Sequence, residues 1–387
     1  MWLKWLPWKF VVSRVARAHG FLDPVSILSH LHRFAQPSEV AEPIELLRAG
    51  VVFHARGLMN TRAIQHNLDW IWPYWVERQF DPKDPSFIPR AFSITHVNLT
   101  HRNWTAVGVP DHESMPIVDP RGLVTPFLDS WSLDGWVVAE DGRSLIPSRL
   151  PFVSQRLSLE RGFAVMTEAS CDGLSLNSQV EVCLESHQPV CRMHLNARAD
   201  SKAWAIVSLR PYNPEGVSFV HEVVLQSDRK TWTIHGRSSI EFSIPVERHR
   251  LSNYRSGDVH IDLPLPGNQD SIKCDVGMAT AAALFELEPD QPREIMVRIP
   301  LHEHPKSRAL FSSGRETQAW QEALRGHCEL RVPDERFRFL YDVALRSIIL
   351  HSPGVVFPGP YTYKRFWFRD AAFILHAMLC AGLTDRA

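Results

Sequence analysis

The alternation of hydrophobic and polar residues in the middle of the chain predicts β-strands. A period of two runs through residues 180–185, 240–246 and 295–299. This period places one side of a strand in a core and the other side in solvent. Stretches rich in Gly, Pro, Asn and Asp separate the runs, and no helix-length pattern lies between them. We therefore expect a mainly β fold, with a large antiparallel sandwich over residues 51–305.

A helical period replaces the alternation after Pro300 and Pro305. Residues 316–324 are good helix formers, so we expect a linker helix within residues 306–332. From Asp334 onward, a second helix is predicted by an apolar stripe with i, i+3, i+4, i+7, i+8 and i+11 spacing. The stripe consists of Phe337, Leu340, Tyr341, Ala344, Leu345 and Ile348.

A third helix is predicted from about Asp370 to Gly382, and its sequence is apolar nearly all round. A helix of this kind requires enclosure by other helices. Residues 333–387 hold one helical pair, so we expect them to be the start of a truncated helical domain.

Residues 1–50 contain short apolar pieces divided by prolines, and we expect a helical appendage there. The first 22 residues combine basic side chains with Trp2, Trp5 and Trp8, as interfacial amphipathic segments do. Docking on the protein's own domain is favoured over membrane contact. There is no run of about 18 apolar residues and no signal-peptide pattern, so we expect a soluble, unprocessed protein.

Composition narrows the class of partner. The 42 Lys and Arg residues nearly balance the 43 Asp and Glu residues, which argues against a nucleic-acid partner.

A chain of 387 residues exceeds one ordinary domain, so two folded units are expected. The six cysteines form no CxxC pair, and we expect free thiols in a reducing, cytoplasmic compartment. Glycine-rich nucleotide motifs are absent, and no cofactor is expected.

The stretch Trp367-Phe368-Arg369-Asp370 carries the strongest candidate chemistry, because two charged residues stand between aromatic residues and a predicted buried helix. A guanidinium offers several fixed donors, and a carboxylate accepts from adjacent hydroxyls. Together with an aromatic face, such a pair suits the hydroxyls and the apolar ring face of a sugar. The competing interpretation is a helix N-cap aspartate beside a solvated arginine.

Residues 359–373, which include this motif, resemble the start of the (α/α)6 barrel in six-hairpin glycosidases of the glucoamylase-like and amylo-α-1,6-glucosidase (glycogen debranching) types. Residues 210–216, Arg-Pro-Tyr-Asn-Pro-Glu-Gly, resemble a segment of the β-supersandwich that precedes this barrel. The resemblance implies that Arg369 and Asp370 bind the non-reducing-end sugar of an oligosaccharide or polysaccharide, and that Trp367 and Tyr363 line the same pocket.

The same resemblance implies inverting hydrolysis of α-glucosidic bonds by two carboxylic residues. In the family both come from later helices, so we expect no catalytic acid or base in this chain and an inactive fragment. Two alternatives stay open. One is a sugar phosphorylase of the same architecture, and the other is a non-catalytic carbohydrate-binding or assembly module.

Three weaker candidates remain. The aromatic run at residues 70–75 fits core packing better than a sugar platform. His302 and His304 lack a third ligand, so no metal site is expected. Residues 98 and 101–104 form a polar-aromatic cluster for which a solvated loop is favoured over a place at the mouth of the barrel.

Overall fold

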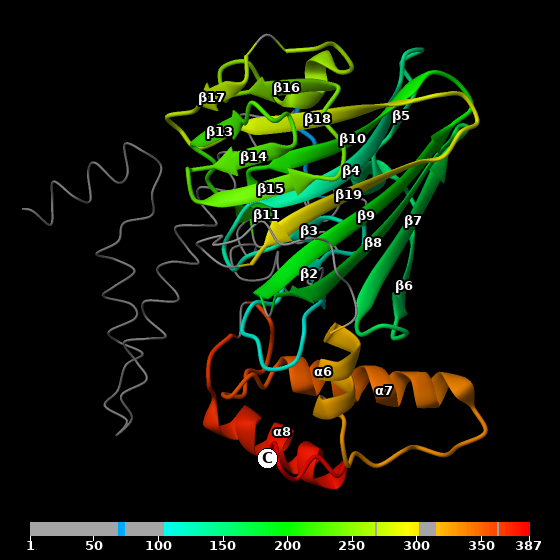
Figure 1. The fold of residues 1–387 in the computed structure, drawn as a ribbon, viewed down its shortest axis with the longest axis vertical. Coiled ribbons are helices and arrows are strands. Elements are labelled where there is room, and N and C mark those ends of the chain that lie inside the picture. The colour runs from blue at the N-terminus through cyan, green and yellow to red at the C-terminus, as the bar shows by residue number, and fades with distance from the viewer. Residues whose placement is uncertain are drawn as a thin grey trace, which may run out of the picture. The chain divides into compact units, whose positions relative to one another are not determined.

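A computed structural model describes residues 69–73, 104–301 without 187, 215 and 268, 315–361, and 364–387. The chain divides into two units, residues 1–68 with 88–100 and residues 69–87 with 101–387. All described residues belong to the second unit. They form two large antiparallel sheets followed by three helices, which confirms the mainly β fold class (Figure 1). The predicted N-terminal appendage lies outside the described residues.

The first large sheet has eight strands. Its order is β1-β2-β3-β4-β10-β18-β16, with β5 paired to β4. The strands are β1 (Thr105–Ala106), β2 (Ile117–Val118), β3 (Val124–Thr125), β4 (Ser132–Ala139), β5 (Ser144–Leu145), β10 (Ala203–Arg210), β16 (Arg248–Ser252) and β18 (Thr280–Leu287). Every residue of β4 and β10 is buried, so the centre of this sheet is covered on both faces.

The second large sheet has nine strands in the order β17-β13-β14-β15-β19-β9-β8-β7-β6. The strands are β6 (Ser154–Ser158), β7 (Ala164–Cys171), β8 (Leu174–Glu185), β9 (Gln188–Ala199), β13 (Glu222–Leu225), β14 (Thr231–Ile234), β15 (Ser238–Phe242), β17 (Ser271–Lys273) and β19 (Arg293–Pro300). A short hairpin, β11 (Tyr212–Asn213) and β12 (Gly216–Val217), and two 3₁₀ turns, η3 (Pro147–Arg149) and η4 (Val259–Asp262), complete the β region.

The predicted alternation is confirmed at residues 180–182 of β8 and 295–297 of β19, where a half-buried residue separates two buried hydrophobic ones. It does not continue to the end of β8, because Cys183 and Glu185 are buried while Leu184 is half-buried. The run at residues 240–246 is shorter than predicted, because β15 ends at Phe242. Pro245 explains the early end, since proline has no N–H to donate to a strand ladder.

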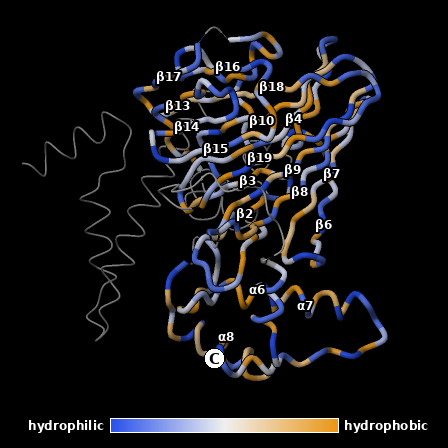
Figure 2. The backbone as a smooth tube through the Cα atoms, in the orientation of Figure 1, coloured by the Kyte–Doolittle hydropathy of each residue, from blue (hydrophilic) through white to orange (hydrophobic). Residues whose placement is uncertain are grey.

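The core lies between the two sheets, and hydrophobic segments concentrate in their strands (Figure 2). Gly135 of β4 shows how closely the sheets approach. A Cβ atom at Gly135 would lie 3.2 Å from a methyl of Leu176 on β8 and 3.2 Å from a methyl of Leu195 on β9. A side chain at this position would therefore push the sheets apart.

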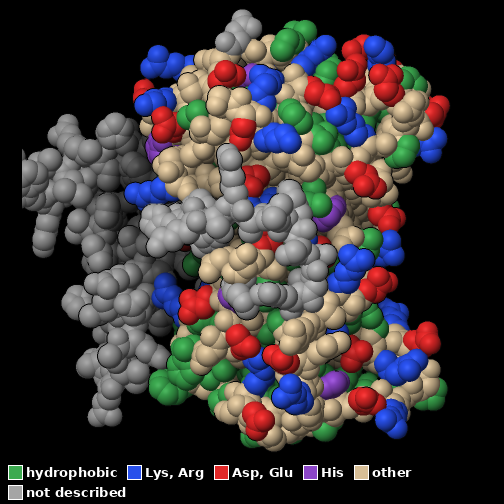
Figure 3. Space-filling view, in the orientation of Figure 1, with side chains coloured by type: hydrophobic (Ala, Val, Ile, Leu, Met, Phe, Trp, Pro, Cys, Tyr) green, Lys and Arg blue, Asp and Glu red, His purple; other side chains and the backbone are tan. Residues whose placement is uncertain are grey.

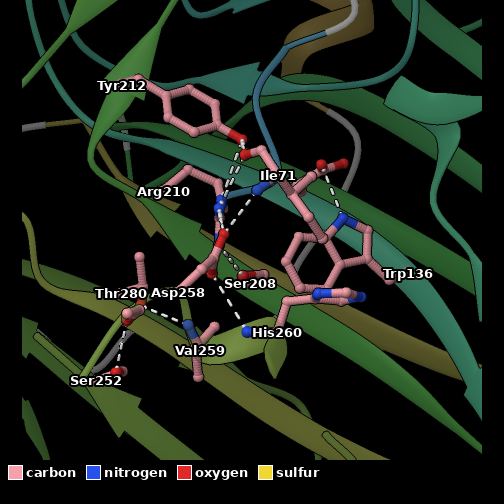
Figure 4. A network of polar contacts seen from close by, with 12 residues as sticks. Ile71, Trp136, Ser208, Arg210, Tyr212, Ser252, Asp258, Val259, His260 and Thr280 are labelled. Atoms are coloured by element: carbon pink, nitrogen blue, oxygen red, sulfur yellow. Dashed lines mark hydrogen bonds and ion pairs between the residues drawn. The ribbon is translucent and has the colours of Figure 1, made fainter. Parts of the chain in front are cut away.

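A fully buried ion pair ties residues 69–73 to the first sheet (Figure 4). Arg210 Nη1 donates to Asp258 Oδ1 at 2.8 Å, and Nη2 donates to Oδ2. The guanidinium also donates to the Ile71 carbonyl at 2.9 Å and to the Tyr212 hydroxyl at 3.1 Å. Ile71 N–H donates back to Asp258 at 2.8 Å, and Tyr212 donates to the Ile71 carbonyl at 2.6 Å. The segment at residues 210–216 therefore has a structural role, at the end of β10 and in the following hairpin.

The three helices follow the two sheets. They are α6 (Arg315–Ala323), α7 (Glu335–Leu350) and α8 (Phe368–Cys380). The Asp334 side chain caps α7 by accepting from the N–H groups of Arg336 and Phe337, at the position where the sequence predicted the helix to begin. No helix among the described residues is long and apolar enough to cross a membrane.

The helices contact the β region through large side chains placed against glycines. Trp320 of α6 is buried, and a Cβ atom at Gly162 would lie 2.9 Å from its indole nitrogen. A Cβ atom at Gly108 would lie 2.9 Å from Leu350 of α7. The absence of a side chain at both glycines thus allows α6 and α7 to pack against the β region.

The burial of α7 and α8 differs from the sequence pattern. Phe337 and Leu340 of the predicted stripe are exposed, and burial is confined to Leu345, Ile349 and Leu350 near the C-terminal end of α7. On α8, Phe373 and Leu379 are exposed while Ala371 and Met378 are buried. Within the described part of the chain, the apolar circumference of α8 is thus not enclosed.

Candidate functional site

The first turn of α8 brings the predicted charged pair to the surface. Trp367 is the N-cap residue and has an extended backbone, and the Ala371 N–H donates to its carbonyl at 2.8 Å. Asp370 is therefore the third residue of the helix and does not cap it, so the competing N-cap interpretation of this aspartate is wrong. Its carboxylate still lies near the helix N-terminus, where the helix dipole favours a negative charge.

Arg369 and Asp370 form a loose ion pair. Arg369 Nη2 lies 3.6 Å from Asp370 Oδ2, and the side chains are 83% and 32% exposed. An exposed pair of this length contributes little to stability. The guanidinium donors and the carboxylate acceptors are consequently open to a solute from solvent.

Three aromatic residues directly precede the pair in the sequence. Phe366 is 47% exposed and Phe368 is 85% exposed, and their ring centroids are 5.0 Å apart in an edge-on arrangement. Trp367 lies half-buried between them in sequence. Exposed aromatic rings next to charged hydrogen-bonding groups offer both an apolar surface and polar contacts to one ligand.

The loop before α8 is anchored on the β region by Tyr361 and Lys364. Tyr361 is buried, and its hydroxyl accepts from the Asp129 N–H at 2.8 Å. Its ring meets Trp104 edge-on, with centroids 5.9 Å apart. Lys364 Nζ donates to the Glu113 carbonyl. These contacts hold the chain that leads into Trp367 and so fix where the Arg369–Asp370 pair is displayed.

Burial affects two titratable groups near this loop. Together with the nearby Lys364 ammonium, it lowers the pKa of His351 to about 4, so this side chain is neutral at pH 7. Burial also lowers the pKa of Lys364, although the Glu113 carboxylate opposes this.

Three of the four predicted site residues, Trp367, Arg369 and Asp370, share the start of α8, and Tyr363 lies outside the described residues. The sequence interpretation missed Tyr361 and Lys364 as anchors. Their position in a loop dense in aromatic and basic residues was the available signal, but their partners lie more than 200 residues earlier. Trp104 is the member of the predicted polar-aromatic cluster that the structure describes, and it contacts this loop.

The other sequence candidates have structural roles or stay untested. Trp70 and Trp72 are 2% and 4% exposed and stack on each other, so they belong to the core, as favoured from the sequence. His302 and His304 lie outside the described residues. Among the residues that the structure describes, no three His, Cys, Asp or Glu side chains gather in a way that could hold a metal ion.

Charge is mixed over the visible surface. Acidic and basic side chains are interspersed on the face shown in Figure 3, in keeping with the net charge of −1. No single sign of charge dominates that face, so its field does not favour a highly charged partner.

No protein-family model matches this sequence, and no curated protein matches it either. Among solved structures, the fold is similar to that of a bacterial glucoamylase complexed with acarbose. The two chains are 9% identical with a TM-score of 0.50, and the match covers 73% of this chain and 49% of that one. The chain therefore spans about half the length of that glucoamylase.

Two further solved structures show a weaker likeness. A putative kojibiose phosphorylase from the human microbiome is 9% identical, with a TM-score of 0.35 over 64% of this chain and 35% of that one. An α-mannosidase from Bacteroides thetaiotaomicron is 9% identical, with a TM-score of 0.31 over 65% of this chain and 38% of that one. At such identity, the likeness to the glucoamylase shows a shared fold and nothing finer.

Proposed function

We propose that this chain is part of a carbohydrate-active enzyme and that the start of α8 binds the terminal sugar of an α-glucosidic oligosaccharide. The observation that carries the proposal is the solvent-facing Arg369–Asp370 pair, which directly follows exposed aromatic residues at the start of α8. The likeness of the fold to a glucoamylase that binds acarbose supports it. In this reading the two large sheets hold the loop that displays the pair.

Each side chain has a role that follows from its chemistry. The Arg369 guanidinium donates to sugar oxygens, and the Asp370 carboxylate accepts from hydroxyls, so the two recognise a vicinal diol together. Trp367, with Tyr363 as a further lining residue, supplies the apolar surface for the ring face. The reaction we propose for the whole protein is inverting hydrolysis, in which one carboxylic acid protonates the leaving oxygen and a second carboxylate activates water. Neither group is assigned to a residue of this chain.

The six cysteines are all free thiols in the structure. Their state supports the further proposal that the protein works in a reducing compartment such as the cytoplasm.

Titration of the chain with acarbose in a calorimeter tests the proposed site. We expect saturable binding that weakens at least about tenfold in Asp370→Asn, because a hydrogen bond to a charged group contributes about 1.5–3 kcal/mol. Asp385→Asn is the matched control, since Asp385 is also an exposed aspartate near the C-terminal end. Equal affinity in wild type and Asp370→Asn would contradict the assigned role.

A product assay on the whole protein separates the reaction classes. If the protein is a hydrolase, it should release free sugar from maltoheptaose in a buffer that contains no phosphate. Release that depends on phosphate and yields a sugar 1-phosphate would identify a phosphorylase instead. Binding of acarbose without turnover of maltoheptaose would favour a non-catalytic binding module.

A further inference from the structure

A polar groove runs across the exposed face of the nine-stranded sheet. It crosses β6, β7, β8, β9 and β19 and has a volume of about 600 Å³. Ligand sites in proteins typically measure about 300–1,000 Å³. The groove lies away from the start of α8, and its lining includes none of the residues assigned to the sugar site above.

The register of the sheet arranges the side chains of this groove in rows. Asn177 of β8 lies opposite Asn196 of β9, and the row continues to Glu168 on β7 and Glu294 on β19. Neighbouring strands are about 4.8 Å apart, so the row presents amide and carboxylate groups at that spacing. Among the described residues, neither asparagine side chain has a hydrogen-bond partner, which leaves both amides available to a ligand.

The next row combines polar and apolar groups. Gln179 lies opposite His194, with Met166 and Met296 on the outer sides of the pair. Burial lowers the pKa of His194, although the Glu181 carboxylate opposes the effect. The neutral ring offers one donor and one acceptor. The two half-buried thioethers supply polarizable apolar surface next to these polar groups.

A second hollow of about 790 Å³ continues the groove towards α7. The two hollows share Arg156, Arg161, Met166, Gln179 and Glu181. Phe339 of α7, which is 39% exposed, lines the far end. The combined groove is therefore elongated, with an aromatic ring at one end, and suits an extended ligand better than a compact one.

The charge of the lining restricts the ligand further. The 600 Å³ hollow carries two arginines and three glutamates, so it has no excess of positive charge to attract a polyanion. Arg156 is already engaged by Glu168, with Nη2 3.1 Å from Oε1. We therefore expect a neutral ligand that has many hydroxyl groups, which both donate and accept hydrogen bonds, and that also has apolar C–H faces.

We propose that this groove is a second carbohydrate site, which binds a neutral oligosaccharide along the exposed face of the sheet. Asn177 and Asn196 hydrogen-bond its hydroxyls, and Met166 and Met296 contact its C–H faces. The proposal rests on the lining of the groove and is independent of the role of Arg369 and Asp370. The groove would hold a longer substrate at a distance from the site at the start of α8.

Methionine methyl resonances of the full chain, followed by NMR during titration with maltoheptaose, test the proposal. We expect the signals of Met166 and Met296 to shift and saturate. A parallel titration with mannohexaose distinguishes a groove that binds oligosaccharides in general from one that is selective for α-glucosides. Met378 serves as an internal reference, because it is buried and lies on α8, the helix that carries the other proposed site.

The double variant Asn177→Leu with Asn196→Leu should weaken the binding reported by Met166 and Met296 at least about tenfold. Gln188→Leu, an exposed amide at the far end of β9, should leave it unchanged. Because the replaced asparagines are solvent-facing, the unfolding midpoint should stay near that of wild type.

Three results would overturn the proposal. The first is that neither Met166 nor Met296 responds to either sugar, and the second is that their response is unchanged in the double variant. The third is that a heparin hexasaccharide shifts their signals while the neutral sugars do not. A response of Met378 alone would reject the groove and leave the α8 site standing. A response of Met166 and Met296 alone would support the groove, and the acarbose titration would then decide on the α8 site.

Discussion

Two arginine–aspartate pairs in this molecule have the same chemistry and opposite surroundings. Arg210 and Asp258 are 0% exposed, and their remaining donors and acceptors are satisfied by backbone groups and by the hydroxyls of Tyr212 and Ser208. Arg369 and Asp370 are 83% and 32% exposed and lie 3.6 Å apart. The first pair is fully occupied within the fold, whereas the second is open to solvent. Burial and partners, more than residue type, therefore distinguish a structural pair from the pair that we propose binds a ligand.

The largest expected effect comes from breaking the buried pair. Asp258→Ala leaves the Arg210 guanidinium buried without its counter-charge, so we expect a loss of about 3–5 kcal/mol in the free energy of unfolding. Urea unfolding followed by tryptophan fluorescence measures it. The matched variant Asp370→Ala should change the free energy by no more than about 0.5 kcal/mol. Similar losses in the two variants would remove the distinction between the pairs.

Two buried carboxyl groups, those of Asp119 and Asp134, should make the free energy of unfolding depend on pH. Burial raises the pKa of Asp119 to about 6 and that of Asp134 to about 7, above the ordinary value near 3.8. Between pH 4 and 7 the folded state therefore holds protons that the unfolded state has lost. The free energy of unfolding should fall as pH rises through this window, by at most about 1.4 kcal/mol per pH unit for each carboxyl.

Urea unfolding at pH 5, 6, 7 and 8 measures this dependence. Asp134→Asn should flatten the profile, because the amide cannot ionise. A profile that rises with pH, or one that Asp134→Asn does not alter, would contradict the assigned burial effect.

A smaller effect sharpens the description of the buried network. Tyr212→Phe removes a hydroxyl that accepts from Arg210 Nε at 3.1 Å and donates to the Ile71 carbonyl at 2.6 Å. We expect a loss of about 1–3 kcal/mol, since two buried polar groups lose a partner. Tyr254→Phe is the control, because Tyr254 is 38% exposed and has no part in the network. A loss no larger than that of the control would show that the hydroxyl is dispensable.

The sequence predicted local structure where one pattern dominates. The alternation at residues 180–182 and 295–297 and the start of α7 after Asp334 were predictable, because each depends on neighbouring residues. Burial along α7 was not recoverable. Phe337 and Leu340 belong to the apolar stripe, yet packing against the β region involves Leu350 near the other end of the helix.

Long-range partners explain what the sequence could not predict about the sites. Tyr361 and Lys364 meet Asp129 and Glu113 across more than 200 residues, and no local pattern encodes such contacts. The polar groove likewise depends on the pairing of β6, β7, β8, β9 and β19, two of which are separated by the whole segment from β10 to β18. By contrast, Arg369 and Asp370 were predicted together because adjacent residues at a helix start remain close in any fold.

We propose that the Arg369–Asp370 pair serves binding and not stability. Acarbose affinity and the free energy of unfolding, measured together on Arg369→Gln, distinguish these two roles. We predict an affinity at least about tenfold weaker than wild type with an unfolding free energy within about 0.5 kcal/mol. Unchanged affinity, or a loss of stability large enough to account for the weaker binding, would contradict the claim.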